Sequence, residues 1–472
     1  MKKLHLTLED LFDIPSAQIY NPDSLGKIFS VSIDTRTIKK NSLFIAIKGK
    51  NFDGHTFIKE AIDKGASAVL VNNNYLKHLD DIDIPIITVN NTLKALGFIA
   101  STWRNKLQAK VIALTGSNGK TTTKEIVVKL LSNKYKVTAT IGNNNNDIGV
   151  PLTILSADEN TEMLVLELGT NHFGEIEYTS EIAKPDLALI TNIGESHLEF
   201  LNNKEGVLKE KEAIFRAAKK NNGKVLINSS DSLLFSLRKN YEGCILFGFK
   251  GKASIKGNTL KIDEKGRPTL EIKYNDNSIL LDSPLFGKSN SQNLLAATAI
   301  ALTLGMSADE IIDSVGLLKP VKQRLEVFDY KNIYIIDDTY NANPVSLKAS
   351  LNIMSTIKVN KRKVVVLGDM FELGESANLL HKEIAKDVLK SGVKEVLLLG
   401  KLMKNLYTEL NAVLAKSTQK SNINVLKFFP TREKLSNYLL KNDFERTTVL
   451  FKGSRGMKME EFSTILKDRY GK

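Results

Sequence analysis

Residues 113–125, ALTGSNGKTTTKE, decide the fold of the central part of this chain. They follow an apolar run at 111–114 and lead into an amphipathic stretch at 121–131, so the pattern predicts a strand, a glycine loop and a helix in succession. Backbone amides at the start of such a helix form a site for phosphate groups. The stretch therefore predicts ATP binding.

Individual residues of this loop have distinct expected roles. Gly116 and Gly119 let backbone amides approach an anion closely, Lys120 places a positive charge between the outer phosphates, and Thr121 offers a hydroxyl to Mg²⁺. The strict motif also has a glycine at position 114, where this chain has Leu114, so the motif is a variant. The alternative is an ordinary helix start after a strand, and the remaining sequence must decide between them.

Length and composition indicate a large globular protein. With 472 residues, the chain exceeds one hydrophobic core and should form about three domains. The single cysteine, Cys244, excludes an internal disulfide and fits a reducing compartment. The start, MKKLHLTLEDLFD, is not a signal peptide, and the longest apolar stretch, 294–306, is too short to span a bilayer. We therefore expect a cytoplasmic protein without membrane insertion.

The net charge of +13 is spread along the chain, with lysines over 204–224 and 358–363. Such a distribution is typical of solvated helix faces, and it also fits a polyanionic substrate. A P-loop ATPase that acts on nucleic acid would show clustered arginines and exposed aromatic residues, whereas aromatic residues total 7% here. The composition therefore predicts no nucleic-acid partner.

Three blocks of alternating strand and helix patterns predict an α/β protein. In the first block, strands are expected at 31–36, 42–49 and 66–71, with a helix near 56–64 and a looser pattern around 101–109. In the second, strands are expected at 111–114, 163–166 and 187–190, followed by shorter β segments to about 285 and a buried helix at 291–304. In the third, which begins near Pro320, strands are expected near 333–336, 363–367, 395–399, 424–429 and 447–451. Helical stretches separate these last strands, which is a doubly wound parallel pattern.

Two strand ends of the second block have side chains that can bind a metal. Glu167 follows the strand at 163–166, and His197 comes shortly after the strand at 187–190. Ligands of parallel sheets gather at the carboxyl ends of strands. Mg²⁺ prefers oxygen ligands, so Glu167 is a natural ligand, directly or through water. His197 is a less usual one, and the alternative is a loop histidine with no such role.

The helix expected at 205–219 contains an anomaly. Apolar residues at 207, 208, 214 and 215 place Lys211 inside the apolar stripe of this helix. Such a lysine either extends its ammonium group to solvent or becomes desolvated, which lowers its pKa. A neutral amine can capture carbon dioxide as a carbamate, and the carbamate oxygens would help to hold a second Mg²⁺. The pattern leaves both interpretations open.

Three polar segments follow strands of the third block. They are DDTYNANP (337–344), LGDMFELGE (367–375) and FKGSRG (451–456). Each one alone is typical of a turn. Three of them at the same expected edge of one sheet indicate a binding face.

Several segments together resemble the Mur ligase family. They are GSNGKTT (116–122), ELGTNHFGEI (167–176), TNIGESHLE (191–199), DDTYNANPVS (337–346), LGDMFELGE (367–375) and KGSRGMKME (452–460). IDTR (33–36) and LFIAIKGKNFDGH (43–55) are similar to the family's uridine-nucleotide domain, so the resemblance covers nearly the whole chain. It implies a UDP-muramoyl substrate-binding α/β domain at 1–108, a central P-loop ATP-binding domain with a mostly parallel sheet at 109–319, and a Rossmann-like, doubly wound ligase domain at 320–472.

The resemblance also implies roles for individual residues. ATP would be bound by Gly116, Ser117, Asn118, Gly119, Lys120, Thr121, Thr122, Asn290, Asn293, Arg324 and Asp338. Metal ligands would be Thr121, Glu167, His197 and Lys211 as a carbamate, and the catalytic residues would be Lys120, Glu167, His197 and Lys211. The substrate would contact Thr35, Arg36, Asn144, Asn145, Asn146 and Asp147. Ser289 and Gln323 depart from the family, which often has histidine and glycine there, so adenine packing should differ near them.

The reaction implied by the resemblance is ATP-dependent and Mg²⁺-dependent peptide ligation. A UDP-N-acetylmuramoyl tripeptide would be activated as an acyl phosphate and joined to D-alanyl-D-alanine by a monomeric enzyme of peptidoglycan synthesis, and thus of cell shape and cell division. The third domain would close by a hinge near 318–321.

A related ligase that adds one amino acid should lack DDTYNANP and FDGH together, and this chain has both. The sequence leaves open whether the third residue of the tripeptide is lysine or a diamino acid. The sequence also leaves open the alternative that the carboxyl-terminal block is an interaction domain with no catalytic role.

Overall fold

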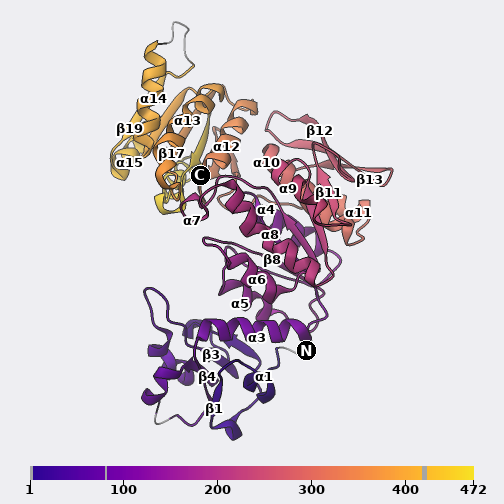
Figure 1. Cartoon of the computed structure of the whole chain (residues 1–472). Helices are drawn as coiled ribbons and strands as arrows, with labels where there is room; N and C mark the ends of the chain where they lie inside the picture. The colour runs from indigo at the N-terminus through magenta and orange to yellow at the C-terminus, as the bar shows by residue number, and fades with distance from the viewer. Residues whose placement is uncertain (1–3, 80–81, 417–421, 472) are drawn as a thin grey trace. The chain divides into compact units, whose positions relative to one another are not determined.

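The computed structural model describes residues 4–79, 82–416 and 422–471 (Figure 1). Three sheets of five, nine and six strands, with helices between their strands, confirm the predicted α/β class. The chain divides into two compact units. The first comprises Met1–Thr115, Leu131–Leu189 and Glu210–Val225, and the second comprises Gly116–Leu130, Ile190–Lys209 and Leu226–Lys472. The domain boundaries expected after residues 108 and 319 stay predictions.

The five-stranded sheet belongs to the amino-terminal part of the chain and has the order β1-β5-β4-β3-β2. Its strands are β1 (Gln18–Tyr20), β2 (Ser30–Ser32), β3 (Ser42–Ile45), β4 (Ala66–Asn72) and β5 (Ile86–Val89), and only β1 runs antiparallel to its neighbour. Two helices of this part are α1 (Leu8–Phe12) and α2 (Ile58–Asp63), the latter packed on β4. Strand β2 is shorter than the expected 31–36. It ends early because the Asp34 carboxylate accepts the Arg36 amide and caps a 3₁₀ turn at Thr35–Thr37.

Helix α3 (Thr92–Lys106) shows that the looser pattern expected around 101–109 was wrong. The Asn91 side chain caps its start, and Leu96, Ile99 and Trp103 form a buried stripe at helical spacing. The Trp103 indole donates to the carbonyl of Ala157 at 2.9 Å. Arg104 is buried and donates to the carbonyl of Ala183. Tertiary partners therefore stabilise the end of this helix.

The nine-stranded sheet has the order β14-β13-β12-β11-β10-β9-β6-β8-β7. Its strands are β6 (Lys110–Thr115), β7 (Val137–Ala139), β8 (Met163–Glu167), β9 (Leu187–Ile190), β10 (Lys224–Asn228), β11 (Ile245–Gly248), β12 (Ile255–Ile262), β13 (Pro268–Tyr274) and β14 (Asn277–Asp282). Pairing is parallel for β6 with β8, β7 with β8, and β10 with β11 with β12. It is antiparallel from β12 through β14. The predicted mostly parallel central sheet is thus confirmed.

Helices of the central part agree closely with the sequence patterns. They are α4 (Lys120–Leu131), α5 (Gly149–Ser156), α6 (Glu175–Ala183), α7 (Leu198–Leu201), α8 (Lys204–Lys220), α9 (Ser232–Ser236), α10 (Gly287–Thr303) and α11 (Ala308–Gly316). The helices expected at 121–131, 205–219 and 291–304 correspond to α4, α8 and α10. In the part of the chain that the structure describes, no helix is both long and apolar enough to cross a bilayer.

The six-stranded sheet has the order β15-β16-β20-β17-β18-β19 and is parallel except for β15. Its strands are β15 (Glu326–Tyr330), β16 (Ile333–Asp338), β17 (Arg362–Gly368), β18 (Glu395–Leu399), β19 (Val425–Phe429) and β20 (Thr447–Lys452). Strand β15 was not expected from the sequence. The helices of this part are α12 (Pro344–Thr356), α13 (Ala377–Lys390), α14 (Met403–Lys416), α15 (Arg432–Lys441) and α16 (Glu460–Tyr470).

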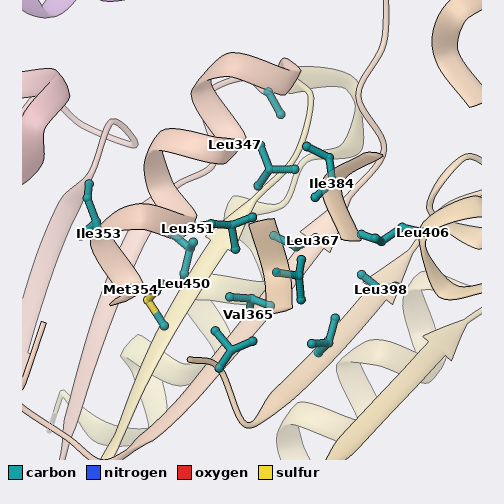
Figure 2. Packing of buried hydrophobic residues seen from close by; sticks show 14 of the residues in the cluster. Leu347, Leu351, Ile353, Met354, Val365, Leu367, Ile384, Leu398, Leu406 and Leu450 are labelled. Atoms are coloured by element: carbon teal, nitrogen blue, oxygen red, sulfur yellow. The ribbon is translucent and has the colours of Figure 1, made fainter. Parts of the chain in front are cut away.

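Apolar side chains cover both faces of this six-stranded sheet. On one face, Leu351 of α12 and Ile384 of α13 pack with Val365 of β17 and Leu398 of β18, and Figure 2 shows this cluster. A second cluster includes Leu435 of α15 and Phe462 of α16. Because helices cover both faces of a parallel sheet, the predicted doubly wound arrangement is confirmed. Loops at the carboxyl ends of its strands are then the expected place for ligands.

Candidate active site

The phosphate loop, residues 116–119, lies between β6 and α4 and is built by close approaches that only glycine permits. Gly119 has φ +80°, and a Cβ atom there would lie 2.2 Å from Oδ1 of Asn293. A Cβ atom on Gly116 would lie 1.9 Å from Oγ1 of Thr191. Lys120 folds back over the loop, where its Nζ donates to the carbonyl of Gly116 at 2.8 Å. The absence of a side chain at these glycines therefore allows neighbouring segments, as well as a phosphate, to approach the loop backbone.

The segment after β9 braces the phosphate loop. The amide of Ser117 donates to the Asn192 carbonyl at 3.0 Å, and the amide of Asn118 donates to Asn192 Oδ1 at 3.1 Å. Thr191 Oγ1 donates to the Asn118 carbonyl at 2.7 Å. The amide of Gly194 donates to Ser117 Oγ at 2.9 Å. Thr191 and Asn192 were quoted in a sequence motif but had no expected role, and only the fold shows that they hold the loop.

Helix α10 contributes the two predicted asparagines. Asn293 Oδ1 accepts from Thr123 Oγ1 at 3.3 Å, and Asn293 Nδ2 donates to Asn290 Oδ1 at 3.2 Å. Asn290 in turn donates to the carbonyl of Phe286 at 2.9 Å. Both side chains are buried. The structure therefore brings Asn293 against the start of α4, and the predicted role of both asparagines in ATP binding stays a prediction.

Residues from the third block also contact the phosphate loop. Arg324 Nη2 donates to Thr121 Oγ1 at 3.1 Å, and Asn343 Nδ2 donates to Asn118 Oδ1 at 2.9 Å. Asn118 Nδ2 is buried and has no hydrogen-bond partner in the part of the chain that the structure describes. Arg324 was a predicted nucleotide residue, whereas Asn343 was not, although it lies in the quoted segment 337–344. Both contacts place polar groups from this block next to the expected phosphates.

Asp338 lies at the end of β16 within a buried polar cluster. Its carboxylate accepts from Ser350 Oγ at 2.6 Å and from the amide of Leu325 at 3.2 Å. Lys452 Nζ, at the end of the paired strand β20, lies 2.5 Å from Asp338 Oδ2. Lys452 is almost fully buried, so removal of either partner would leave an uncompensated buried charge. The Leu325 contact connects Asp338 to the segment that contains Arg324.

His197 occupies an unusual backbone position after β9. Its φ is 53°, in the left-handed region, and its Nδ1 lies 2.9 Å from Oε2 of Glu372. The His197 contact holds the pKa of Glu372 below its ordinary value, because it favours the carboxylate form. Glu372 belongs to the segment 367–375 that was expected to bind ligands. The predicted role of His197 as a metal ligand stays a prediction.

Glu167 ends β8 and is buried, with 1% of its surface exposed. Its Oε1 accepts from Asn145 Nδ2 at 2.8 Å, whereas its buried Oε2 has no hydrogen-bond partner among the described residues. A buried carboxylate oxygen without a partner costs free energy, and a cation or its bound water would satisfy it. The side chain therefore fits the predicted role as a Mg²⁺ ligand. Among the described residues, no three His, Cys, Asp or Glu side chains are grouped as a metal site.

Lys211 lies on α8 and is 1% exposed. Its side chain therefore does not extend into solvent, and the first of the two interpretations of its position was wrong. The preceding residue, Glu210, is also buried and accepts from the amides of Gly174 at 2.7 Å and Ile176 at 2.8 Å. Glu210 thereby fixes α8 against the start of α6. Formation of a carbamate on Lys211 stays a prediction.

The predicted peptide-binding segment, 144–147, contacts the loop after β8. The amide of Gly169 donates to the Asn145 carbonyl at 2.7 Å, and Asn146 Oδ1 accepts the amide of Gly149 at the start of α5. Burial raises the pKa of Asp147, and the nearby Glu175 raises it further. The Asn144 carbonyl lies where a Cβ atom on Gly149 would clash, at 2.3 Å. Asn145 thus joins the expected substrate segment to Glu167.

The predicted uridine-nucleotide residues lie in the turn after β2. Arg36 donates paired hydrogen bonds to the Asp34 carboxylate, from Nε to Oδ1 at 2.9 Å and from Nη2 to Oδ2 at 2.6 Å. The hydrogen bond from Arg36 lowers the pKa of Asp34 to about 2. The Arg36 side chain is 84% exposed, whereas Thr35 is buried. The guanidinium is therefore accessible to an anionic ligand.

Comparisons with known proteins bear directly on this arrangement. Models described as Mur ligase family, catalytic domain, as Mur ligase middle domain, and as Mur ligase, glutamate ligase domain match residues 27–104, 114–301 and 323–455. The UDP-N-acetylmuramoyl-tripeptide--D-alanyl-D-alanine ligase of Bacillus subtilis is 34% identical over 98% of each chain. The chain belongs to the Mur ligase family.

Other relatives of this Mur ligase extend the comparison. The enzyme of the same name from Buchnera aphidicola is 37% identical over 94% of each chain. A crystal structure of MurF from Acinetobacter baumannii covers 100% of both chains with a TM-score of 0.87 at 28% identity. MurF ligase from Thermotoga maritima, solved in complex with ADP, covers 94% of this chain and 98% of its own, with a TM-score of 0.81 at 28% identity.

Within this Mur ligase, the predicted residues form separate groups. The loop residues 116–122 lie with Asn290, Asn293 and Arg324, and Asp338 is connected to them through Leu325. Glu167 lies with Asn145 in the other unit, which also contains Lys211. Thr35 and Arg36 lie beside the five-stranded sheet. The residues that sequence reasoning missed, Thr191, Asn192 and Asn343, are polar side chains within quoted motifs, and that position was their only signal.

Proposed function

We propose that this Mur ligase joins D-alanyl-D-alanine to a UDP-N-acetylmuramoyl tripeptide, with cleavage of ATP to ADP and phosphate. The observation that carries the proposal is the match over nearly the full length to relatives named for this reaction. The product would be the pentapeptide precursor of peptidoglycan. We place the reaction in the cytoplasm and expect the enzyme to act as a monomer, without nucleic acid as a partner.

The proposed domains follow the sequence blocks. Residues 1–108 would bind the UDP-muramoyl substrate, residues 109–319 would bind ATP, and residues 320–472 would complete the ligase site. The family-model matches at 27–104, 114–301 and 323–455 support this division. Movement of the last domain would be absorbed near 318–321, a segment outside the regular elements.

In the first proposed step, an oxygen of the tripeptide carboxylate attacks the γ-phosphorus of ATP. The bond from that phosphorus to the bridging oxygen breaks, so ADP leaves and an acyl phosphate forms. A free carboxylate acylates amines poorly at neutral pH, and the phosphate supplies a good leaving group. The protein contributes mainly position and charge. We assign this role to the loop 116–122, with Lys120 beside the outer phosphates and Asn290, Asn293, Arg324 and Asp338 around the rest of the nucleotide.

In the second proposed step, the amine of D-alanyl-D-alanine attacks the acyl carbon. The tetrahedral intermediate then expels phosphate, and the amine loses a proton as the peptide bond forms. No protein nucleophile takes part. This agrees with the position of Cys244 outside all of the motifs. Exclusion of water from the acyl phosphate favours attack by the amine over hydrolysis.

We assign Mg²⁺ to Thr121, Glu167, His197 and the Lys211 carbamate. When bound, Mg²⁺ would neutralise negative charge on the phosphoryl oxygens. The buried, unpartnered Oε2 of Glu167 supports this assignment most directly. The Thr121 hydroxyl lies at the start of α4, directly after the phosphate loop, and accepts a hydrogen bond from Arg324.

The muramoyl substrate is assigned to two segments. Thr35 and Arg36 would hold the uridine diphosphate, because the exposed Arg36 guanidinium can form paired hydrogen bonds with a phosphate. Asn144, Asn145, Asn146 and Asp147 would contact the peptide. The hydrogen bond from Asn145 to Glu167 gives this second segment a direct connection to the proposed metal ligand.

A reconstituted reaction tests the proposal. Purified protein is mixed with ATP, Mg²⁺, UDP-muramoyl tripeptide and D-alanyl-D-alanine, and ADP release is followed as each substrate is omitted. We expect release only when both muramoyl tripeptide and dipeptide are present. Equal release without the dipeptide, or with a single amino acid in its place, would refute the assignment.

Deletion of residues 321–472 should abolish turnover, and retained turnover would show an interaction role for that block.

Lys211→Ala tests the carbamate. The variant should lose nearly all activity and regain part of it with short carboxylic acids, which replace the anionic oxygens of a carbamate. Lys209→Ala, at an exposed position of the same helix, is the matched control and should keep its activity. Independently of turnover, ¹³C-labelled bicarbonate should give a carbamate carbon signal in the wild type and not in Lys211→Ala. Full activity of Lys211→Ala would contradict the assignment.

A further inference from the structure

The loop that follows β20 occupies the centre of the carboxyl edge of the six-stranded sheet. Strand β20 lies between β16 and β17, so its loop, residues 453–456, has the strand-end segments of both neighbours beside it. In doubly wound sheets, ligands bind outside the carboxyl ends of the strands where the strand order changes direction. The strand order changes direction at this point, because β20 is the last strand of this sheet along the chain but lies between β16 and β17.

Ser454 locks the three strand-end segments together. Its amide donates to the carbonyl of Asp369 at 2.9 Å, and its hydroxyl donates to the carbonyl of Ala342 at 3.2 Å. The amide of Phe371 donates to the same hydroxyl at 2.8 Å. Ser454 itself is buried. The backbone that carries the next residue, Arg455, is therefore fixed by both neighbouring segments.

Arg455 is exposed and stacks on an aromatic ring. Its amide donates to Asn341 Oδ1 at 3.3 Å, and its guanidinium carbon lies 5.0 Å from the centre of the Tyr340 ring. The guanidinium carbon of Arg324 lies 3.9 Å from the same ring. Among the described residues, no carboxylate forms an ion pair with either arginine. Two cations thus share one ring without an anion to compensate them, an arrangement that an anionic ligand would stabilise.

The two arginines differ in what their guanidinium groups contact. Arg324 donates to the hydroxyl of Thr121, which lies at the start of α4 directly after the phosphate loop. The Arg455 side chain makes no hydrogen bond to another described residue, and its five donors remain available. A carboxylate matches a guanidinium in geometry and accepts two parallel hydrogen bonds from it. Arg455 is therefore the cation better suited to a second, separate anion.

A second aromatic ring borders the same loop. Phe371 is 41% exposed, and an atom of its ring would lie 3.1 Å from a Cβ atom on Gly456. The ring therefore packs closely over the backbone next to Arg455. Tyr340 and Phe371 together give the surroundings of Arg455 apolar surfaces that suit small methyl side chains.

We propose that Arg455, with Tyr340 and Phe371 beside it, binds the terminal carboxylate of the incoming dipeptide. This inference rests on the proposed ligase function and assigns residues to its second substrate. The guanidinium holds the carboxylate, and the rings contact the methyl groups. Binding by the far end of the dipeptide leaves its amine free to attack the acyl carbon.

Arg455→Gln and a substrate with an amidated terminus test the proposal together. Dipeptide-dependent ADP release is measured with D-alanyl-D-alanine and with D-alanyl-D-alaninamide, which lacks the carboxylate charge. Wild type should show a KM for the amide about 10- to 100-fold higher than for the dipeptide, as expected for loss of a charge-assisted pair. Arg455→Gln should show a similar rise for the dipeptide but little discrimination against the amide. The KM values for ATP and for UDP-muramoyl tripeptide should not change.

The matched control is Arg446→Gln. Arg446 is an exposed arginine that directly precedes β20, at the opposite end of the same strand, so its loss removes one positive charge without affecting the proposed site. It should behave as wild type. Arg455→Lys, which keeps the charge but not the paired donors, should lie between wild type and Arg455→Gln.

Different outcomes separate the two proposals. If Arg455→Gln raises the KM for ATP instead, or discriminates against the amide as strongly as wild type does, the carboxylate site is refuted and the ligase function stands. If wild type shows no dipeptide-dependent ADP release, both proposals fall. Equal urea midpoints for wild type and Arg455→Gln would show that the kinetic change is not a loss of folding.

Discussion

The phosphate loop at 116–119 and the turn at 34–37 are both expected to hold phosphate groups, and the fold holds them in place by different means. Asn192, Asn293 and Asn343, which are far away in the sequence, lie against the phosphate loop or its flanking helix. The turn at 34–37 is held by contacts between Asp34 and its near neighbour Arg36.

This difference teaches how each site obtains its geometry. A loop held by distant segments is ordered when the chain folds, so the cost of ordering it is met before a ligand binds. The Asp34–Arg36 pair is exposed and screened by water, so it contributes little to stability. We therefore expect substitutions in the phosphate loop to affect function and folding together, and substitutions at the turn to have only small effects on folding.

Lys120→Ala should have the largest effect. It removes the positive charge proposed to lie beside the outer phosphates, and loss of one such preorganised group typically costs about 10²- to 10³-fold in rate. The measurement is ADP release at saturating substrates, with the urea midpoint measured in parallel. A loss below about tenfold with a normal midpoint would mean that the loop does not position the phosphates through this side chain.

Gly119→Ala tests whether the loop depends on its distant contacts. Both Gly119 and Gly142 have positive φ, at +80° and +58°, so alanine is strained at either position. Only at Gly119 would the Cβ atom meet another group, the buried Asn293 side chain, which is held by Thr123 and Asn290. We expect Gly119→Ala to weaken ATP binding about 10- to 100-fold and to lower the urea midpoint more than Gly142→Ala does. Equal effects of the two variants would show that the close approach of Asn293 does not constrain the loop.

Asp34→Asn should have the smallest effect, and its effect should depend on pH. Because Arg36 lowers the pKa of Asp34 to about 2, the pair stabilises the fold above the ordinary pKa of aspartate, and this contribution is lost as pH falls toward 2. The difference in unfolding free energy between wild type and variant should stay below about 1 kcal/mol near pH 6 and shrink from about pH 4 downward. Urea unfolding at several pH values measures it, with Asp313→Asn, at an exposed position of α11, as the control. A difference that stays constant to pH 2.5 would exclude the pair as its cause.

Local sequence patterns predicted much of the fold because each of them is a property of a short segment. The strand–loop–helix at 110–131, the buried helix α10 and the parallel strands of the third block follow from runs and spacings of apolar residues. The placement of Lys211 within the apolar stripe of α8 also follows from its spacing, whereas the burial of its whole side chain did not. The end of α3 did not follow, because buried Arg104 is held by groups from a distant segment, the carbonyl of Ala183 and the carboxylate of Asp186.

The sequence by itself determined the family of this chain and the identity of its loop residues, since a motif is a fixed order of residue types. Only the tertiary structure decided that Asn343 contacts Asn118, that Lys452 pairs with Asp338, and that Tyr340 stacks with two arginines. The residues in each of these contacts are separated by about 100 or more positions in the sequence, except for Tyr340 and Arg324. Their partners are chosen by strand order and register, which no local pattern specifies.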